Sequence, residues 1–315
     1  MKILTALLLS LPLLAHADGA AFRRELIQGN VKAALQAPVE GKDAVAAQCM
    51  KARFAQPPEQ TAGPEGPILN AYRRYWHSLL LGQAGKTEAE AALLGDLRRL
   101  VPGEWKDLDA ASEAARATLE RQGLHALAGV THPYYELMVW RSNTSQEYAV
   151  QLPERAAQVK VVMMDGFISR GWLSYASCER FGAGGWTANG TLYALAERYD
   201  TASDKFRISY LAHEGQHFAD NEDYPALEQP ELEYRAKLTE LVLSPNPQTL
   251  FEHFSQTAQA GRKAPHSHAE YWLVQRLRGH AGGPGLGAAA RALLAESSDQ
   301  ARKAGAATVK RFLPD

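Results

Sequence analysis

Apolar residues follow two different spacings along the chain, and the change falls near residue 129. Before that point they recur every three or four positions, which is the period of a helix with one buried face. A run rich in proline and glycine over residues 56–67 predicts a loop that interrupts this period. We therefore expect the following helices in this part of the chain: Phe22–Leu35, Asp43–Phe54, Ile68–Leu81, Thr87–Leu100 and Asp109–Gln122.

Two of these helices carry end signals. Thr87, Glu88, Ala89 and Glu90 have the spacing of a capping box, in which a threonine and a glutamate three residues later bond each other's backbone amides. Gly123 follows the last of the helices and is expected to end it.

From Gly129 onward, β-branched and aromatic residues alternate with polar ones over short runs. These runs predict strands of a mainly antiparallel sheet: Tyr134–Trp140, Gln146–Leu152, Val159–Met164 and Gly190–Ala196. Helical spacing returns after residue 204, again over 230–241 and 264–278, and from 286 onward. The predicted fold class is α+β, with a helical N-terminal region over residues 18–128 and a sheet-containing domain over 129–315.

The first seventeen residues have the pattern of a secretory signal. Lys2 precedes an apolar run over residues 3–14, and Ala15 and Ala17 place small residues where a signal peptidase cleaves. The apolar run is too short to span a membrane. We therefore expect residues 1–17 to be a signal peptide and the protein to be exported, to the periplasm or the extracellular space.

Composition narrows the function classes. With 46% hydrophobic and 22% charged residues, the chain is suited to a sizeable core. A net charge of −1 gives no basic surface for nucleic acid or an anionic membrane, and no later apolar run is long enough for a membrane span. Cys49 and Cys178 are the two cysteines. In an oxidising compartment they are expected either to form a disulfide or to be two buried thiols.

Two histidines stand within the helix expected after Asp204, a residue placed to cap that helix. His213 and His217 are four residues apart, so they project from one face on successive turns and can reach the same metal ion. Glu214 lies at the edge of that face, where it can hold a metal-bound water. Zinc suits this arrangement because it binds imidazole nitrogens and keeps one position open in catalytic sites.

The run from His213 to His217 resembles the motif of the zincin metallopeptidases. A third protein ligand is needed, and the helix expected over 230–241 offers Glu231, Glu233 and Glu240. We predict Glu233, because Ala236 on the same face would let the two helices approach closely. Glu231 suits the helix start, and Glu240 could support a ligand from behind. A motif followed by a helical glutamate resembles the gluzincin branch.

Asp223 is the alternative third ligand, since it lies where the metzincin branch places one. That branch has a glycine at the position of Asp220 and a methionine turn after the motif. All five methionines of this chain precede the motif, so we prefer Glu233. Asp220 is expected either to hold an imidazole in its tautomer or to be a solvated acid.

The resemblance implies two further features. One is a downstream residue that stabilises the oxyanion, for which His266, His268 and Tyr271 are candidates. The other is an edge strand that pairs with an extended substrate. Residues 184–187 and 191–195 are both candidates for it, and the sequence does not separate them.

The sequence therefore predicts an exported zinc metallopeptidase that acts on a protein or peptide. His213, His217 and Glu233 are expected to bind Zn2+, with Glu214 as general base toward the zinc-activated water. Two alternatives remain open at this point. One is a periplasmic binding or scaffold protein with a structural or vestigial metal site, and the other is an enzyme that hydrolyses a non-peptide amide such as a cell-wall cross-link.

Overall fold

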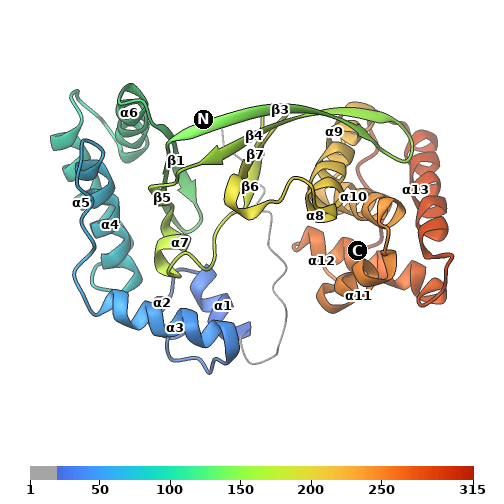
Figure 1. Ribbon diagram of the computed structural model, residues 1–315, viewed down its shortest axis with the longest axis horizontal. Helices are drawn as coiled ribbons and strands as arrows, with labels where there is room; N and C mark the ends of the chain where they lie inside the picture. The colour runs from blue at the N-terminus through green and yellow to red at the C-terminus, as the bar shows by residue number, and fades with distance from the viewer. Residues whose placement is uncertain (1–19) are drawn as a thin grey trace. The chain divides into compact units, whose positions relative to one another are not determined.

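The computed structural model describes residues 20–315, and the expected signal peptide, residues 1–17, lies outside this part. The fold is α+β, as predicted, with helices in the N-terminal half and antiparallel and mixed sheets (Figure 1). Packing divides the chain into two units. Unit 1 comprises the chain up to Thr144 together with Met164–Trp186, and unit 2 comprises Ser145–Met163 and Thr187–Asp315. The expected domain limits at residues 128 and 129 remain a prediction.

The helices of unit 1 up to residue 121 follow the predicted apolar spacing, whereas the short helix at residues 172–176 was not predicted. They are α1 (Ala20–Ile27), α2 (Val31–Ala34), α3 (Gly41–Phe54), α4 (Gly66–Leu80), α5 (Lys86–Leu100), α6 (Leu108–Arg121) and the short α7 (Trp172–Ala176).

Two details of the helix predictions are wrong. The helix expected over Phe22–Leu35 is broken into α1 and α2, because Gly29 takes a φ of 76°, which ends the first helix, and Asn30 caps the second. The capping box at Thr87 does not form. Helix α5 already begins at Lys86 after Gly85, so Thr87 lies inside the first turn.

The core of unit 1 is apolar and gathers aromatic side chains. Trp76 and Tyr72 of α4 are fully buried together with Trp172 of α7. Cys49 of α3 and Cys178 after α7 form a disulfide, which settles the alternative left open by the sequence. A three-stranded antiparallel sheet, in the order β1 (His125–Thr131), β2 (Tyr134–Trp140) and β5 (Ser169–Arg170), completes the unit.

A second sheet has the strand order β3 (Ser142–Gln151), β4 (Ala156–Asp165), β7 (Thr191–Leu195) and β6 (Gly185–Ala188). The unit boundary passes through β3, β4 and β6. Strand β6 is at an edge of this sheet and β7 is internal. Of the two segments considered as a substrate-pairing edge, only residues 184–187, of which 185–187 lie in β6, have an edge position.

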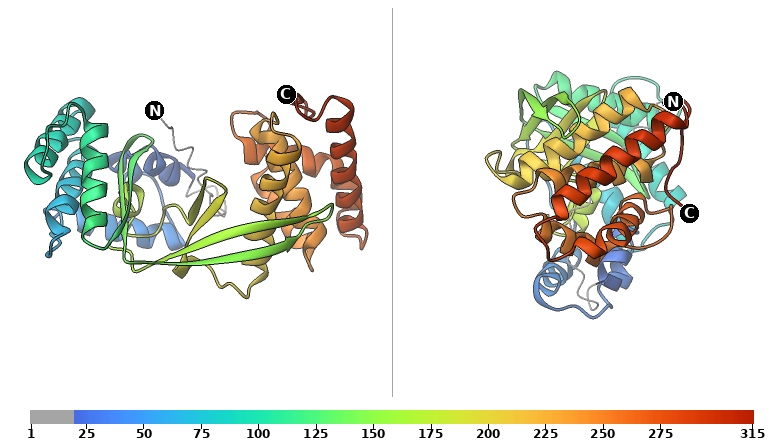
Figure 2. Two further views of the ribbon diagram at one scale, coloured as in Figure 1. Left: turned by 90° about the horizontal axis from the view of Figure 1, so that it is seen from above. Right: turned by 90° about the vertical axis from the view of Figure 1, so that its right-hand side faces the viewer.

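Unit 2 is otherwise helical. Its helices are η2 (Ala196–Arg198), α8 (Asp204–Phe206), the π-helical turn η3 (Arg207–Ala212), α9 (His213–Asp223), α10 (Gln229–Leu243), α11 (Pro247–Thr257), α12 (Pro265–Leu277), η4 (Arg278–His280) and α13 (Leu286–Lys303). Helix α10 is the central one, and α9, α11, α12 and α13 all pack against it (Figure 2). Ser203 caps α8 through the amide of Phe206, so Asp204 is not the cap that the sequence suggested.

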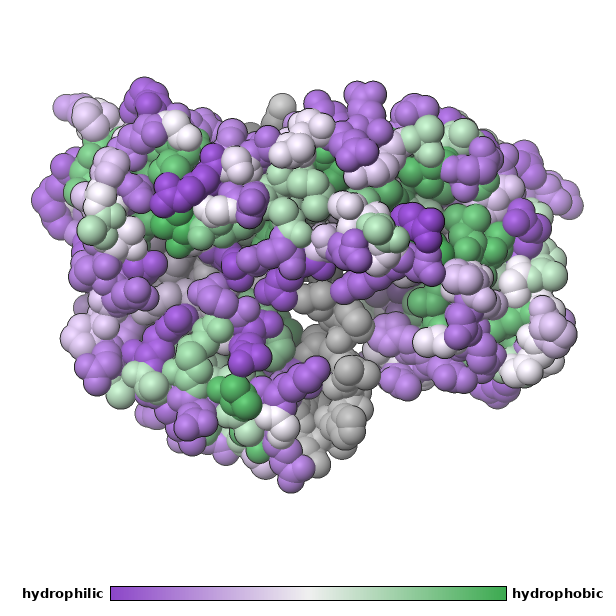
Figure 3. Space-filling model, in the orientation of Figure 1, coloured by the Kyte–Doolittle hydropathy of each residue, from purple (hydrophilic) through white to green (hydrophobic). Residues whose placement is uncertain are grey.

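The surface carries few large apolar side chains. Among residues 20–315, the exposed ones are Ile27, Val45 and Val130. Hydrophilic residues predominate on the face drawn in Figure 3, where hydrophobic residues form only small groups. Within the same part of the chain, no helix has both the length and the apolar character needed to cross a bilayer.

Candidate metal centre

Helix α9 brings two histidines together at the buried centre of unit 2. The side chains of His213 and His217 lie one turn apart, and their Nε2 atoms face each other at 3.1 Å. The glycine between them is explained by packing. A Cβ atom on Gly215 would lie 3.3 Å from Val159 Cγ2 in β4 and 3.6 Å from Leu152 Cδ2 just after β3, so the helix rests directly on these residues. Both histidines are nearly fully buried.

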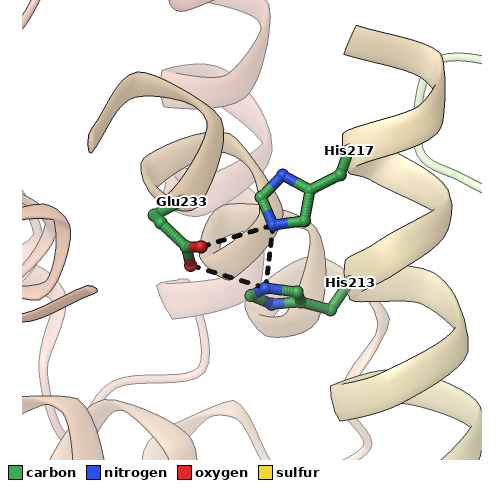
Figure 4. A group of neighbouring side chains, drawn as sticks. All are labelled: His213, His217 and Glu233. Carbon is green, nitrogen blue, oxygen red and sulfur yellow. Dashed lines mark hydrogen bonds and ion pairs between the residues drawn. The ribbon is translucent and has the colours of Figure 1, made fainter. Parts of the chain in front are cut away.

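Helix α10 supplies the third side chain. Pro230 stands in its first turn, where the missing N–H costs nothing. Glu233 is buried, with 1% of its surface exposed. Its carboxylate oxygens lie 3.5 Å from His213 Nε2 and 3.5 Å from His217 Nε2. Figure 4 shows the two imidazoles from one helix and the carboxylate from the facing helix pointing toward one another.

These three side chains fit a divalent cation. One ligand atom from each lies within 4.8 Å of the other two. Nitrogen and oxygen ligands placed about 2.1 Å from a tetrahedral zinc ion are roughly 3.4 Å apart, close to the spacings found here. Neither oxygen of Glu233 makes a well-directed hydrogen bond within residues 20–315, although both are buried. A buried carboxylate in that condition needs a cation nearby.

The pKa shifts of His213 and Glu233 also indicate that this group requires a positive charge. Burial lowers the pKa of His213, but the carboxylates of Glu233 and Glu240 outweigh burial and raise it to about 10. Burial raises the pKa of Glu233, but the neighbouring imidazoles, led by His213, bring it well below its ordinary value. Without a metal, a proton on an imidazole supplies the positive charge that the carboxylates require. A divalent metal ion would supply positive charge in its place and displace that proton.

Glu240 supports His213 from behind. Its Oε1 atom lies 2.7 Å from His213 Nδ1, so this carboxylate accepts the Nδ1–H and leaves Nε2 facing His217 and Glu233. Such a carboxylate fixes the tautomer and orientation of a ligating imidazole. This is the supporting position that the sequence suggested for Glu240.

Glu214 follows His213 in α9 and is 1% exposed. Its Oε2 atom accepts a hydrogen bond of 3.2 Å from the hydroxyl of Thr187 in β6. Its Oε1 atom is buried and has no hydrogen-bond partner among residues 20–315. The sequence gave no reason to single out Thr187 for this contact, because its position opposite Glu214 depends on the pairing of β6 with β7.

The competing acids lie elsewhere. Asp223 is on the surface, where it accepts a 3.0 Å hydrogen bond from Arg155. Asp220 is neither solvated nor hydrogen-bonded to an imidazole. It is buried and accepts hydrogen bonds from Arg235 Nε at 2.9 Å and from the amide of Gln216 at 2.8 Å. Both sequence interpretations of Asp220 are therefore wrong, because they treated it without its buried arginine partner.

The three candidates for an oxyanion-stabilising residue differ in whether they reach the metal group. His268 is buried and contacts the backbone of Gly261 and Pro314, so its role is structural. Tyr271 packs against the ring of Trp272. His266 is the one that reaches the group, with Nδ1 2.7 Å from Glu233 Oε2.

The comparisons with known proteins add no identification. No family model, curated protein or solved structure matches this chain. The resemblance to the zincins therefore rests on the motif and on the geometry of the three side chains.

Proposed function

We propose that the protein is an exported, zinc-dependent metallopeptidase. The single observation that carries this proposal is the position of Glu214. It follows His213 directly in α9, and its buried Oε1 atom has no hydrogen-bond partner among residues 20–315. A carboxylate that directly follows a metal-ligand candidate and has a free lone pair is what a general base requires.

Each side chain then has a role. His213, His217 and Glu233 hold the ion, which supplies Lewis acidity when bound and so makes water more acidic and a carbonyl more electrophilic. Glu214 takes the proton from the attacking water and returns it to the leaving amine. Thr187 donates to the other oxygen of Glu214 and keeps the carboxylate oriented.

The edge position of β6 supports a peptide as substrate. An edge strand presents unpaired backbone groups to which an extended peptide can add as a further strand. Because Thr187 of β6 contacts Glu214, a peptide paired with this strand would run beside the general base. No comparable support exists for a cell-wall amide.

The test is metal content and turnover measured on the same variants. Glu214→Gln should retain zinc and lose peptide hydrolysis by about 10²–10⁴-fold, the usual contribution of a general base. Glu233→Ala should lose zinc, while Asp223→Ala should keep both zinc and turnover.

The alternatives predict different results. A binding or scaffold protein would show no hydrolysis of a peptide library by the wild type, and Glu214→Gln would then change nothing. Hydrolysis of purified cell wall but not of peptides would replace the peptidase by an amidase. Loss of zinc in Asp223→Ala alone would show that the wrong third ligand was chosen.

A further inference from the structure

His266 contacts the third ligand of the metal group without being one of the ligands. Its Nδ1 atom lies 2.7 Å from Glu233 Oε2. At that distance Nδ1 must carry a hydrogen, because two lone pairs so close would repel each other. His266 does not belong to the set whose ligand atoms all lie within 4.8 Å of one another. It is therefore placed to act on the carboxylate and not on the ion.

We propose that His266 is a positioning residue that orients the Glu233 carboxylate for metal binding. This inference rests on the proposed function, because it concerns the same site. It differs from the oxyanion role that the family resemblance suggested for this histidine. As Glu240 lies behind the imidazole of His213, His266 lies against the carboxylate of Glu233, and each contact joins a metal-ligand candidate to a side chain outside the ligand set.

The packing of α12 on α10 holds His266 in place. One turn further along both helices, Lys237 Nζ lies 2.9 Å from Glu270 Oε1, and both of these side chains are buried. Lys237 follows Glu233 by four residues, and Glu270 follows His266 by four, so the two pairs form successive steps between the same helix faces. The ammonium of Lys237 also lies 4.6 Å from the ring centre of Phe254 in α11. The contact between His266 and Glu233 therefore follows from a fixed register of the two helices.

The degree of exposure also suits a positioning residue. The side chain of His266 is 31% exposed, whereas Glu233 is 1% exposed. Removing the imidazole should therefore leave the fold intact, because it opens no closed cavity in the core. It should affect the carboxylate, because His266 Nδ1 lies 2.7 Å from Glu233, nearer than the imidazole nitrogens of His213 and His217 at 3.5 Å.

The experiment measures the zinc dissociation constant by competition with a chelator, on the full mature protein. His266→Ala should weaken zinc binding by about 10–100-fold, as losses of such supporting contacts do. His266→Asn should recover most of the affinity, because its amide nitrogen can donate near the position of Nδ1. His280→Ala is the matched control, since it removes an exposed imidazole just beyond α12 and should change nothing.

Two further readouts separate positioning from other roles. The visible spectrum of the cobalt-substituted protein should be the same in the wild type and in His266→Asn, because the ligand set is unchanged. The thermal unfolding of the metal-free protein should be the same in the wild type and in His266→Ala, because the role concerns metal binding and not folding.

Each contrary outcome would overturn either the positioning role of His266 alone or the proposed function as well. Suppose that the wild type is active and contains zinc, and that His266→Ala binds zinc with the same affinity. This result would overturn the positioning role alone. A changed cobalt spectrum in His266→Asn, or complete loss of zinc in both variants, would make His266 a ligand and also overturn that role. A wild type that binds no divalent metal would overturn this inference and the proposed function together.

Discussion

The two units bury different kinds of side chain. The core of unit 1 is formed by apolar and aromatic residues, with a disulfide between α3 and the segment after α7. In unit 2 the central helix α10 buries five charged side chains: Glu231, Glu233, Arg235, Lys237 and Glu240. Burial of apolar surface is favourable by itself, whereas burial of charge is costly unless a partner is present.

Each buried charge of α10 has its own partner. Arg262 contacts Glu231, Glu270 contacts Lys237, and Asp220 contacts Arg235. Glu233 and Glu240 differ from the other three because their closest partners are imidazoles of the candidate metal centre and the adjoining His266. The comparison shows that both units have apolar cores, and that unit 2 in addition holds five charged side chains in place along its central helix. The predictions below test this difference.

The largest effect on stability is expected from the disulfide of unit 1. The bond joins cysteines 129 residues apart. In the chain-entropy account, its removal destabilises the fold by up to about 5 kcal/mol. Cys49→Ser with Cys178→Ser should therefore lower the free energy of unfolding of unit 1, while the zinc dissociation constant stays the same. Five of the six tryptophans lie in unit 1, so tryptophan fluorescence in urea follows this unit.

Reduction of the wild type with a thiol is the matched control and should shift the unfolding midpoint in the same direction. A tenfold loss of zinc affinity in the double variant would contradict the separation between a stabilising unit 1 and a charge-ordering unit 2.

The next effect concerns the buried charges of unit 2. Arg235 is 1% exposed and bonds Asp220, Glu154 and the hydroxyls of Ser297 and Ser298. Arg235→Met leaves Asp220 buried without its cation and should cost about 3–5 kcal/mol. Hydrogen exchange of the α10 amides measures this locally.

The double variant Asp220→Asn with Arg235→Met should recover part of that loss, because the uncompensated charge is then removed. Equal destabilisation in the single and double variants would show that the arginine acts by packing and not by charge.

The smallest effect, taken per pH unit, comes from one buried titratable carboxyl group inside unit 1, that of Glu136. Burial raises the pKa of Glu136 to about 8, although the amides of Trp172 and Leu137 and the hydroxyl of Thr131 act to lower it. The protonated form is therefore favoured in the folded state. The contribution of Glu136 to the free energy of unfolding is therefore largest below about pH 4.5. It decreases as the pH rises toward 8, by at most about 1.4 kcal/mol per pH unit.

Glu136→Gln should remove this dependence and be more stable than the wild type at pH 8. Urea unfolding followed by tryptophan fluorescence at pH 5, 7 and 8.5 measures it. A wild type whose stability rises between pH 5 and pH 8 while the variant stays constant would have the opposite sign and contradict the prediction.

Much of the helical part could be predicted from the sequence, because one buried face leaves a regular apolar period. The exceptions had local causes, such as the left-handed conformation of Gly29 that separates α1 from α2. Strand β1 was missed because its sequence, His-Ala-Leu-Ala-Gly-Val-Thr, shows little alternation and buries only Ala126. Its pairing with β2, and not its own composition, makes it a strand.

The three metal-binding candidates were predicted because motif spacing and helix faces are local properties. The positions of Thr187, His266 and Arg235 depend on contacts between segments distant in sequence, which no local pattern encodes. For the same reason the sequence could not choose between the two possible edge strands, and it assigned Asp220 without its partner.

The π-helical turn at Arg207–Ala212 has a consequence for insertions and deletions. A residue added to or removed from a helix rotates everything beyond it by about 100°. Fully buried Phe206 lies before this turn, and the two histidines lie after it. Shortening the turn by one residue would force a choice between seating the phenylalanine and aiming the imidazoles at Glu233. Sequence variants with one residue more or fewer in this turn would retain the motif from His213 to His217. Their two imidazoles would no longer meet Glu233.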